Sequence, residues 1–188
     1  DGTRDILKDY ENRENFQIYY HEYNKGKGAA LRTGFSHTHG DIILIQDADL
    51  EYNPSDYEKL LGPFYENSAD IVYGSRFQGE SHKRVLYFRN RLANSVITFI
   101  SNIFTNLNFT DVETGYKVFK TEILKDLDLK ENTFTFEIES TMKISKKNYR
   151  IFEVGISYEG RTVEEGKKIK FVDGIKAILA IFKYKFFS

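Results

Sequence analysis

Residues 41–49 read Asp-Ile-Ile-Leu-Ile-Gln-Asp-Ala-Asp, a short apolar run that ends in two carboxylates one residue apart. A β-branched run of this length predicts a strand that is buried on both faces. Because side chains alternate along a strand, Asp47 and Asp49 point the same way if the extended backbone continues. Two adjacent carboxylates repel each other, and Mg²⁺ or Mn²⁺, which take oxygen ligands, relieve that repulsion. Ligands bind at the carboxyl ends of strands in open α/β sheets, so the stretch predicts a metal site at the mouth of a parallel sheet.

The composition of the chain narrows the class of protein. Its 188 residues suit one domain, and a hydrophobic content of 40% is enough for a buried core. The formal net charge is -1, so no global basic field attracts nucleic acid. The lack of cysteine excludes a disulfide framework and a thiolate metal site. No apolar run reaches the ~18 residues of a membrane-spanning helix. We therefore expect one domain, residues 1–188, that binds no nucleic acid.

Helix and strand signals alternate around the buried strand. Before it the pattern predicts a helix at 5–12, a strand at 16–20 and a helix at 29–38, and after it a helix that begins near Asn53 and a strand at 70–73. This rhythm predicts a right-handed parallel βαβ sheet. The second half predicts helices at 92–107, 136–146 and 175–187, with strands at 116–119 and 150–158. Residues 1–5 already form a ligand-binding turn in this pattern, so we expect the chain to lack about one N-terminal βα unit, ~30–40 residues.

Separate segments along nearly the whole chain match the motifs of one family. They are Asp1-Gly2-Thr3-Arg4-Asp5, Gly26-Lys27-Gly28-Ala29-Ala30, Asp47-Ala48-Asp49, Gly74-Ser75-Arg76, Thr114-Gly115-Tyr116-Lys117, Phe136-Glu137-Ile138-Glu139, and Arg161 followed by Glu165-Gly166-Lys167-Lys168-Ile169. In this order the sequence resembles the family 2 glycosyltransferases with a GT-A fold, most closely the dolichol-phosphate mannose synthase-like group. The resemblance implies a Rossmann-like α/β fold, with a mainly parallel sheet flanked by helices and an amphipathic helix at 170–188. The family's first strand and the first Asp of its D-D-G pair are absent, so Asp1 corresponds to the second Asp.

The resemblance assigns the donor side of the site to acidic residues. Asp47 and Asp49 would hold Mg²⁺ or Mn²⁺ on the diphosphate of a GDP- or UDP-linked sugar, where the metal neutralises charge on the leaving nucleotide. Glu51 could join this metal shell. Asp1 and Asp5 would bind the nucleoside part of the donor or its phosphate-proximal sugar.

Basic residues predict contacts with phosphate. Lys27 opens a helix, whose N-terminus favours an anion. Arg76 follows a buried strand, so its guanidinium could bind a phosphate through two N–H groups. Arg161 and Lys168 could clamp the donor or acceptor phosphate in a similar way. Together with Asp49, these last three basic residues are the predicted catalytic residues.

Thr114, Lys117 and Glu139 are predicted to bind substrate on the acceptor side of the site. A phosphate monoester has a second pKa of about 6 and is already dianionic at pH 7, so its reaction needs surrounding cations and no base. The basic segments therefore favour a lipid-phosphate acceptor. Transfer to a saccharide hydroxyl would require a carboxylate base, for which Asp111 and Glu113 are candidates.

The resemblance thus implies a metal-dependent inverting glycosyltransferase that moves a sugar from a nucleotide sugar to a polyprenyl phosphate. Lysines and aromatic residues in the C-terminal helix suit a membrane interface, and Arg84, Arg89 and Arg91 could meet anionic headgroups. We therefore expect a cytoplasmic protein that lies peripherally on the inner face of a membrane. Two alternatives stay open: transfer to a saccharide hydroxyl in polysaccharide or glycan synthesis, and an inactive partial GT-A domain. A strand ending in D-x-D also occurs in haloacid dehalogenase-like phosphohydrolases, which usually have Thr or Val where this chain has Glu51.

Overall fold

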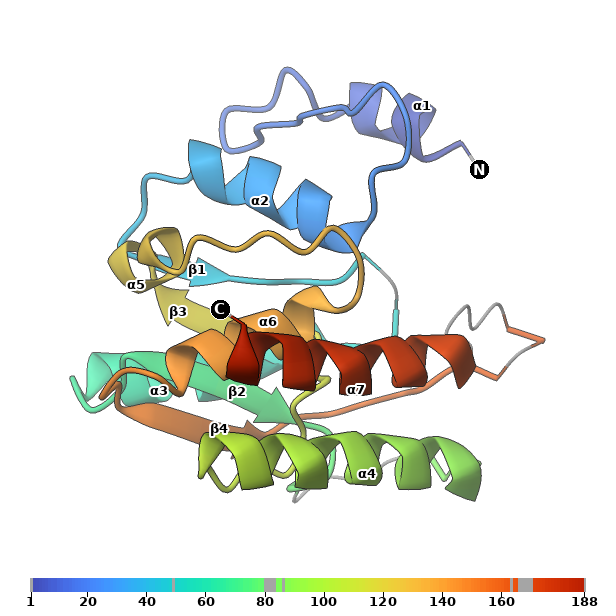
Figure 1. Cartoon of the computed structure of the whole chain (residues 1–188). Helices are drawn as coiled ribbons and strands as arrows, with labels where there is room; N and C mark the ends of the chain where they lie inside the picture. The colour runs from blue at the N-terminus through green and yellow to red at the C-terminus, as the bar shows by residue number, and fades with distance from the viewer. Residues whose placement is uncertain are drawn as a thin grey trace.

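The sheet at the centre of the molecule is mixed. The computed structural model describes residues 2–48, 50–79, 84–85, 87–162, 164–165 and 171–187 (Figure 1). For Phe171 it describes the backbone. Within these residues the sheet order is β1-β3-β2-β4, formed in turn by Ile42–Leu44, Lys117–Lys120, Ile71–Ser75 and Ile151–Gly155. β3 pairs antiparallel with β1 and β2, whereas β2 pairs parallel with β4. Three strands therefore share one direction, and β3 runs against them between β1 and β2. The parallel pairing predicted for the strands at 41–46 and 70–73 is wrong, because β3 separates them and pairs antiparallel with both.

Helices cover both faces of this sheet. The described helices are α1 (Thr3–Lys8), α2 (Lys27–His37), α3 (Tyr57–Tyr65, after a 3₁₀ turn at Pro54–Asp56), α4 (Phe88–Thr105), α5 (Thr121–Asp126), α6 (Phe136–Ile144) and α7 (Phe171–Phe186). Side chains alternate between the two faces of β2. Ile71 and Tyr73 pack into a core that includes residues of α4, α6 and α7. Val72 packs into a second core, which includes a residue of α3. All of β2 is buried, as expected for a strand that is covered on both faces.

The α/β class predicted from the sequence is confirmed, and most predicted helices lie within about one turn of their expected ends. Asn53 caps the turn before α3 as predicted, because its Oδ1 accepts a hydrogen bond from the backbone N–H of Ser55 at 3.0 Å. The strand predicted at 16–20 is wrong. These residues form no strand, and no described strand pairs with them. A strand-like pattern shows that the side chains would suit a sheet, but a strand forms only where a neighbouring strand is available to pair with it.

The carboxyl ends of three strands and the start of β3 meet at one edge of the sheet. The backbone N–H of Ile45, just after β1, donates to the carbonyl of Lys117 at 3.0 Å, and Tyr73 of β2 lies opposite Lys117. Because β3 runs the other way, its first residue reaches the edge at which β1, β2 and β4 end. That edge brings together Asp47, Arg76 and Lys117, which are far apart in the sequence.

Candidate active site

Asp47 lies against a glycine at the edge of the sheet. A Cβ atom on Gly115 would fall 2.4 Å from Asp47 Oδ2, so only glycine lets the carboxylate approach this closely. The backbone N–H of Gly115 in turn donates to the Tyr52 hydroxyl at 2.8 Å. Asp47 itself keeps part of its surface exposed to solvent. The carboxylate is therefore held from behind while its outer side is open to a ligand.

Lys27 joins Asp47 to a second carboxylate. Its Nζ lies 2.8 Å from Asp47 Oδ1 and 2.8 Å from Glu137 Oε1. The other oxygen of Glu137 pairs with Lys117, whose ammonium also donates to the carbonyls of Thr114 and Val112. Burial acts to raise the pKa of Glu137, but Lys117 and Lys27 outweigh it and hold that pKa below its usual range. Positive and negative groups therefore alternate from the exposed carboxylate into the core.

Two glycines explain how Lys27 reaches this position. Gly26 has a φ of 93°, and a Cβ there would lie 2.3 Å from the carbonyl oxygen of Asn132. A Cβ on Gly28 would meet the carbonyl oxygen of Glu131 at 2.2 Å. The start of α2 therefore packs directly on the loop that leads to α6, which sets Lys27 beside Glu137. The glycine-rich motif serves helix packing here, and the phosphate contact predicted for Lys27 stays a prediction.

Arg76 is anchored by a buried aspartate. Its Nε and Nη2 donate to Asp111 Oδ2 and Oδ1 at 2.6 and 2.7 Å, the two-point geometry of an arginine–carboxylate pair. Asn94 Nδ2 donates to the same carboxylate at 3.1 Å, and Asp111 is fully buried. Asp111 is thus committed to Arg76, which argues against it as the free base of a hydroxyl-transfer reaction. Sequence reasoning did not predict this pair, because nothing local tells which carboxylate meets Arg76 across 35 residues.

Glu51 and Arg161 are brought together from distant segments. The backbone N–H of Arg161 donates to Glu51 Oε1 at 2.6 Å, and the Tyr158 hydroxyl donates to Glu51 Oε2 at 3.2 Å. An isolated bridge between Tyr52 and Tyr158 fixes the two segments side by side. Arg161 therefore lies beside the loop that follows Asp47, where its Nε lies 3.4 Å from Glu51 Oε1, and its predicted contact with phosphate stays a prediction. The carboxylate of Glu51 is held by these groups, and its role as a metal ligand stays a prediction.

Other predicted residues lie under the site or away from it. Thr114 and Lys117 are fully buried beneath the site, and their predicted contact with substrate stays a prediction. Glu139 is also fully buried and accepts hydrogen bonds from the backbone N–H groups of Lys130 and Glu131, and its predicted substrate contact stays a prediction. Asp5 is exposed on α1, where its carboxylate pairs with a neighbouring lysine. The predicted site residues Asp1, Asp49 and Lys168 lie outside the described residues.

Asp47 could contribute a ligand to a cation site at this edge. Asp47 is partly exposed and already binds an ammonium group, and carboxylate oxygens are the ligands that Mg²⁺ and Mn²⁺ prefer. Among the residues that the structure describes, no three Asp, Glu or His side chains cluster as a metal site. Asp47 would therefore hold the metal together with groups outside that set, of which Asp49 is the predicted one.

Glu113 is the residue near the site whose shifted pKa we expect to make the stability of the protein depend on pH. Burial raises the pKa of its half-buried carboxyl to about 7, and no described residue gives it a hydrogen bond. Between its ordinary value of 4.5 and about 7, the folded protein keeps a proton that the unfolded chain releases. The free energy of unfolding should therefore fall as the pH rises through this interval, by up to about 3 kcal/mol.

The measurement is urea unfolding at pH 5 and pH 7.5 for the wild-type protein and Glu113→Gln. The glutamine variant should be the more stable protein at pH 7.5, because it removes a carboxylate that is costly to ionise in the folded state. Glu122→Gln, which alters an exposed glutamate on α5, serves as the matched control. A wild-type stability that changes with pH in the same way as that of Glu113→Gln would contradict the prediction.

Comparison with known proteins shows which protein family the sequence is similar to. The family model described as "Glycosyl transferase family 2" matches residues 1–128. The chain is 29% identical to the low-salt glycan biosynthesis hexosyltransferase Agl6 of Haloferax volcanii, over 86% of this chain and 39% of that protein. It is 30% identical to a UDP-N-acetylglucosamine–dolichyl-phosphate N-acetylglucosaminyltransferase of Methanococcus voltae, over 68% of this chain and 53% of that protein. The chain thus spans about half the length of these two relatives or less.

The fold is similar to that of a solved enzyme. Glucosyl-3-phosphoglycerate synthase from Mycobacterium tuberculosis, in complex with Mn²⁺, UDP-glucose and phosphoglyceric acid, superimposes with a TM-score of 0.64 at 16% identity. The match covers 98% of this chain and 64% of that one. At this level of identity the likeness concerns the fold.

Proposed function

The chain belongs to glycosyl transferase family 2, and we propose that it transfers a sugar from a GDP- or UDP-linked donor to a polyprenyl phosphate, as the dolichol-phosphate mannose synthase-like group does. The observation that carries the proposal is the cluster of Asp47, Lys27 and Glu137 at the edge where the strands end. Ligands of open α/β sheets bind at this edge. Mg²⁺ or Mn²⁺ bound at Asp47 would neutralise the charge of the departing nucleoside diphosphate.

The chemistry needs an anionic acceptor and positive groups around it. An oxygen of the acceptor phosphate forms the new bond to the anomeric carbon, and the bond to the nucleoside diphosphate breaks with inversion. The phosphate dianion needs no base, since its second pKa is about 6. Arg76 and Arg161 hold guanidinium groups beside this edge, where each also pairs with a carboxylate, Asp111 for Arg76 and Glu51 for Arg161. Guanidinium groups in this place support a phosphate acceptor. A protein with this acceptor would work peripherally at the cytoplasmic face of a membrane.

A second acceptor class has one observation in its favour. A carboxyl with a pKa of about 7, as Glu113 has, is suited to remove a proton from a saccharide hydroxyl at neutral pH. Glu113→Gln separates the two reactions. It should leave transfer to a polyprenyl phosphate nearly unchanged, whereas it should lower transfer to a hydroxyl by about 100-fold or more, the usual contribution of a positioned base.

Nucleotide binding tests the donor half of the proposal directly. We expect calorimetric titration of the full chain with UDP and with GDP, in Mn²⁺, to show binding of one of them, and EDTA to abolish it. The nucleotide that binds identifies the donor class. A folded protein that binds neither nucleotide in the presence of Mn²⁺ would overturn the proposed function for this chain and favour the inactive-domain alternative.

A further inference from the structure

The outward faces of α4 and α7 are apolar and exposed. On α4, Phe88, Leu92, Val96, Phe99 and Ile103 follow one another at intervals of three and four residues, and their exposed fractions range from 42% to 75%. The same spacing recurs on α7, where the exposed fractions range from 41% to 62% for Val172, Ile175, Leu179, Phe182 and Phe186. Residues at such intervals lie on one face of a helix. Each helix therefore carries a continuous apolar stripe on its solvent side.

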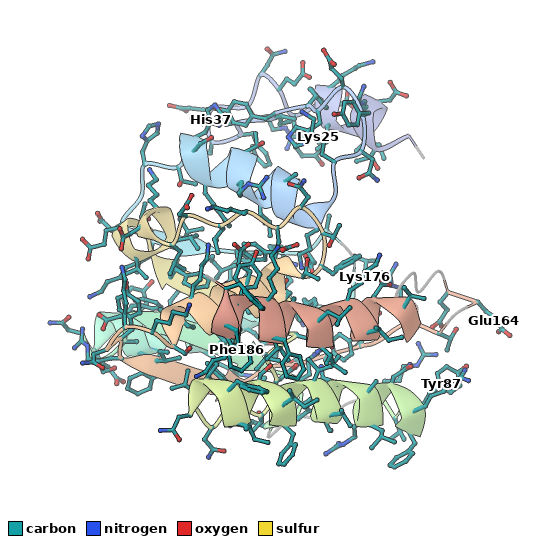
Figure 2. All side chains as sticks on the ribbon, in the orientation of Figure 1. Lys25, His37, Tyr87, Glu164, Lys176 and Phe186 are labelled. Carbon is teal, nitrogen blue, oxygen red and sulfur yellow. The ribbon has the colours of Figure 1, made fainter. Side chains whose placement is uncertain are left out.

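The two stripes form one surface, here called the α4–α7 face. The helices run side by side in the same direction in front of the sheet (Figure 1). Phe104 of α4 packs against Phe182 and Phe186, with ring centroids 5.1 and 6.0 Å apart, and Lys185 Nζ donates to the carbonyl of Phe104 at 2.6 Å. The opposite sides of both helices are buried in the same core. Figure 2 shows Tyr87 and Phe186 near opposite ends of this face.

Charge is segregated on this pair of helices. Together α4 and α7 contain five basic residues and one acidic residue, whereas the whole chain has 27 basic and 28 acidic residues. Arg89 and Arg91 form no ion pair with any described residue, and their guanidinium groups lie over the rings of Tyr87 and Phe77. Lys176 lies on the side of α7 away from α4 (Figure 2). The apolar stripes are thus bordered by cations, of which Lys176 and Lys183 also pair with Asp173 and Glu131.

The apolar stripes and the basic residues together indicate which kind of partner binds the α4–α7 face. No helix among the described residues is long and apolar enough to cross a bilayer. Helices of this kind lie in the plane of an interface, with the apolar side toward acyl chains and basic side chains at the headgroups. A second copy of the chain would bring like charges together across the contact, which disfavours self-association. We propose that the α4–α7 face docks on the surface of an anionic lipid bilayer.

Docking in this orientation would place the candidate site beside the membrane. α4 follows the segment that leaves the carboxyl end of β2, and α7 follows the one that leaves β4. Both helices begin toward the end of the sheet at which these strands finish, and they run back against them (Figure 1). The edge that carries Asp47 and Arg76 would then lie near the headgroup layer. The link to a lipid-phosphate acceptor rests on the proposed function, whereas the docking itself does not.

Vesicle sedimentation tests the docking surface. The full chain should sediment with vesicles of phosphatidylglycerol and phosphatidylcholine, bind pure phosphatidylcholine more weakly, and lose affinity as salt is raised. The double variant Phe99→Asp/Leu179→Asp, which alters one exposed residue in each stripe, should bind anionic vesicles at least about tenfold more weakly. Tyr65→Asp, at the end of α3, is the matched control, since Tyr65 is 76% exposed and the two target residues are 65% and 62% exposed.

The outcomes separate docking from catalysis. Equal binding by the wild-type protein and the double variant, or no sedimentation with either vesicle type, would overturn the docking surface. A concentration-dependent dimer that the double variant abolishes, without any vesicle binding, would assign the face to a second copy instead. Nucleotide titration of the same double variant should match the wild-type protein, because neither residue lies at the strand ends. A double variant that no longer binds vesicles but still binds nucleotide therefore supports docking. If neither the wild-type protein nor the double variant binds nucleotide, that result contradicts the proposed function and leaves the docking surface unaffected.

Discussion

Asp47→Asn should abolish metal-dependent nucleotide binding and lower sugar transfer by about 100-fold or more, while the protein stays folded. Asparagine has nearly the same shape as aspartate, so it should still fit against Gly115. It lacks the negative charge that holds Lys27 and that would hold Mg²⁺ or Mn²⁺. Loss of a residue that only supports a metal ligand already costs about 10–100-fold, so loss of a ligand itself should cost more.

Two further variants show whether the effect belongs to this carboxylate. Asp41→Asn removes an exposed charge at the other end of the same strand and should leave nucleotide binding unchanged. Gly115→Ala keeps every charge but introduces a methyl group 2.4 Å from Asp47 Oδ2, so it should weaken metal-dependent binding by displacing the carboxylate. Calorimetry with Mn²⁺, together with circular dichroism as a check of folding, measures both. Metal-dependent binding that survives in Asp47→Asn would show that Asp47 is not a metal ligand.

The fold could be predicted from the sequence wherever the signal is local. The strand that starts at Ile42 and the long amphipathic helices follow from hydrophobic spacing, which is a property of neighbouring residues. The predicted burial of this strand on both faces is wrong, because β1 is an outer strand of the described sheet, and Ile42 and Leu44 are only half-buried. The place of β3 between β1 and β2 could not be predicted in this way. Its pairing joins Ile42 to Lys120 and Tyr73 to Lys117, and contacts of that range leave no periodic mark on the sequence. The strand predicted at 16–20 failed for the same reason, because its pattern was present and a described partner strand was not.

The sequence indicated several residues of the candidate site, but it did not indicate how their side chains pair or which of them are buried. The D-x-D stretch and the motifs around Lys27 and Arg76 point to one edge of the sheet, and the structure places Asp47, Lys27 and Arg76 at that edge. The sequence does not reveal burial of charged side chains, and the structure shows that Lys117 and Glu139, both predicted to bind substrate, are fully buried. A buried charge needs a partner, and that requirement is the one signal that could have directed attention to the carboxylates near Arg76 and Lys117.

Asp111→Ala should lower the free energy of unfolding by about 3–5 kcal/mol, since it leaves the Arg76 guanidinium buried without its counter-charge. For a chain of this size, each kcal/mol shifts the melting temperature by about 2–4 °C, so the expected fall is on the order of 10 °C. Calorimetric or dichroic melting measures it. The control is Asp126→Ala, whose ion pair with Lys147 is exposed and should be worth about 0–1 kcal/mol.

A double substitution keeps this prediction testable if Asp111→Ala fails to fold. Arg76→Met/Asp111→Leu removes both charges and fills most of their volume, and replacing a buried ion pair in this way is often neutral or stabilising. The double variant should therefore be more stable than Asp111→Ala, even though it has lost one more native residue. Equal losses in Asp111→Ala and Asp126→Ala would contradict the buried pair. A double variant that is stable but binds no donor would show that Arg76 is kept for its charge at the strand ends, where a buried ion pair adds little to stability.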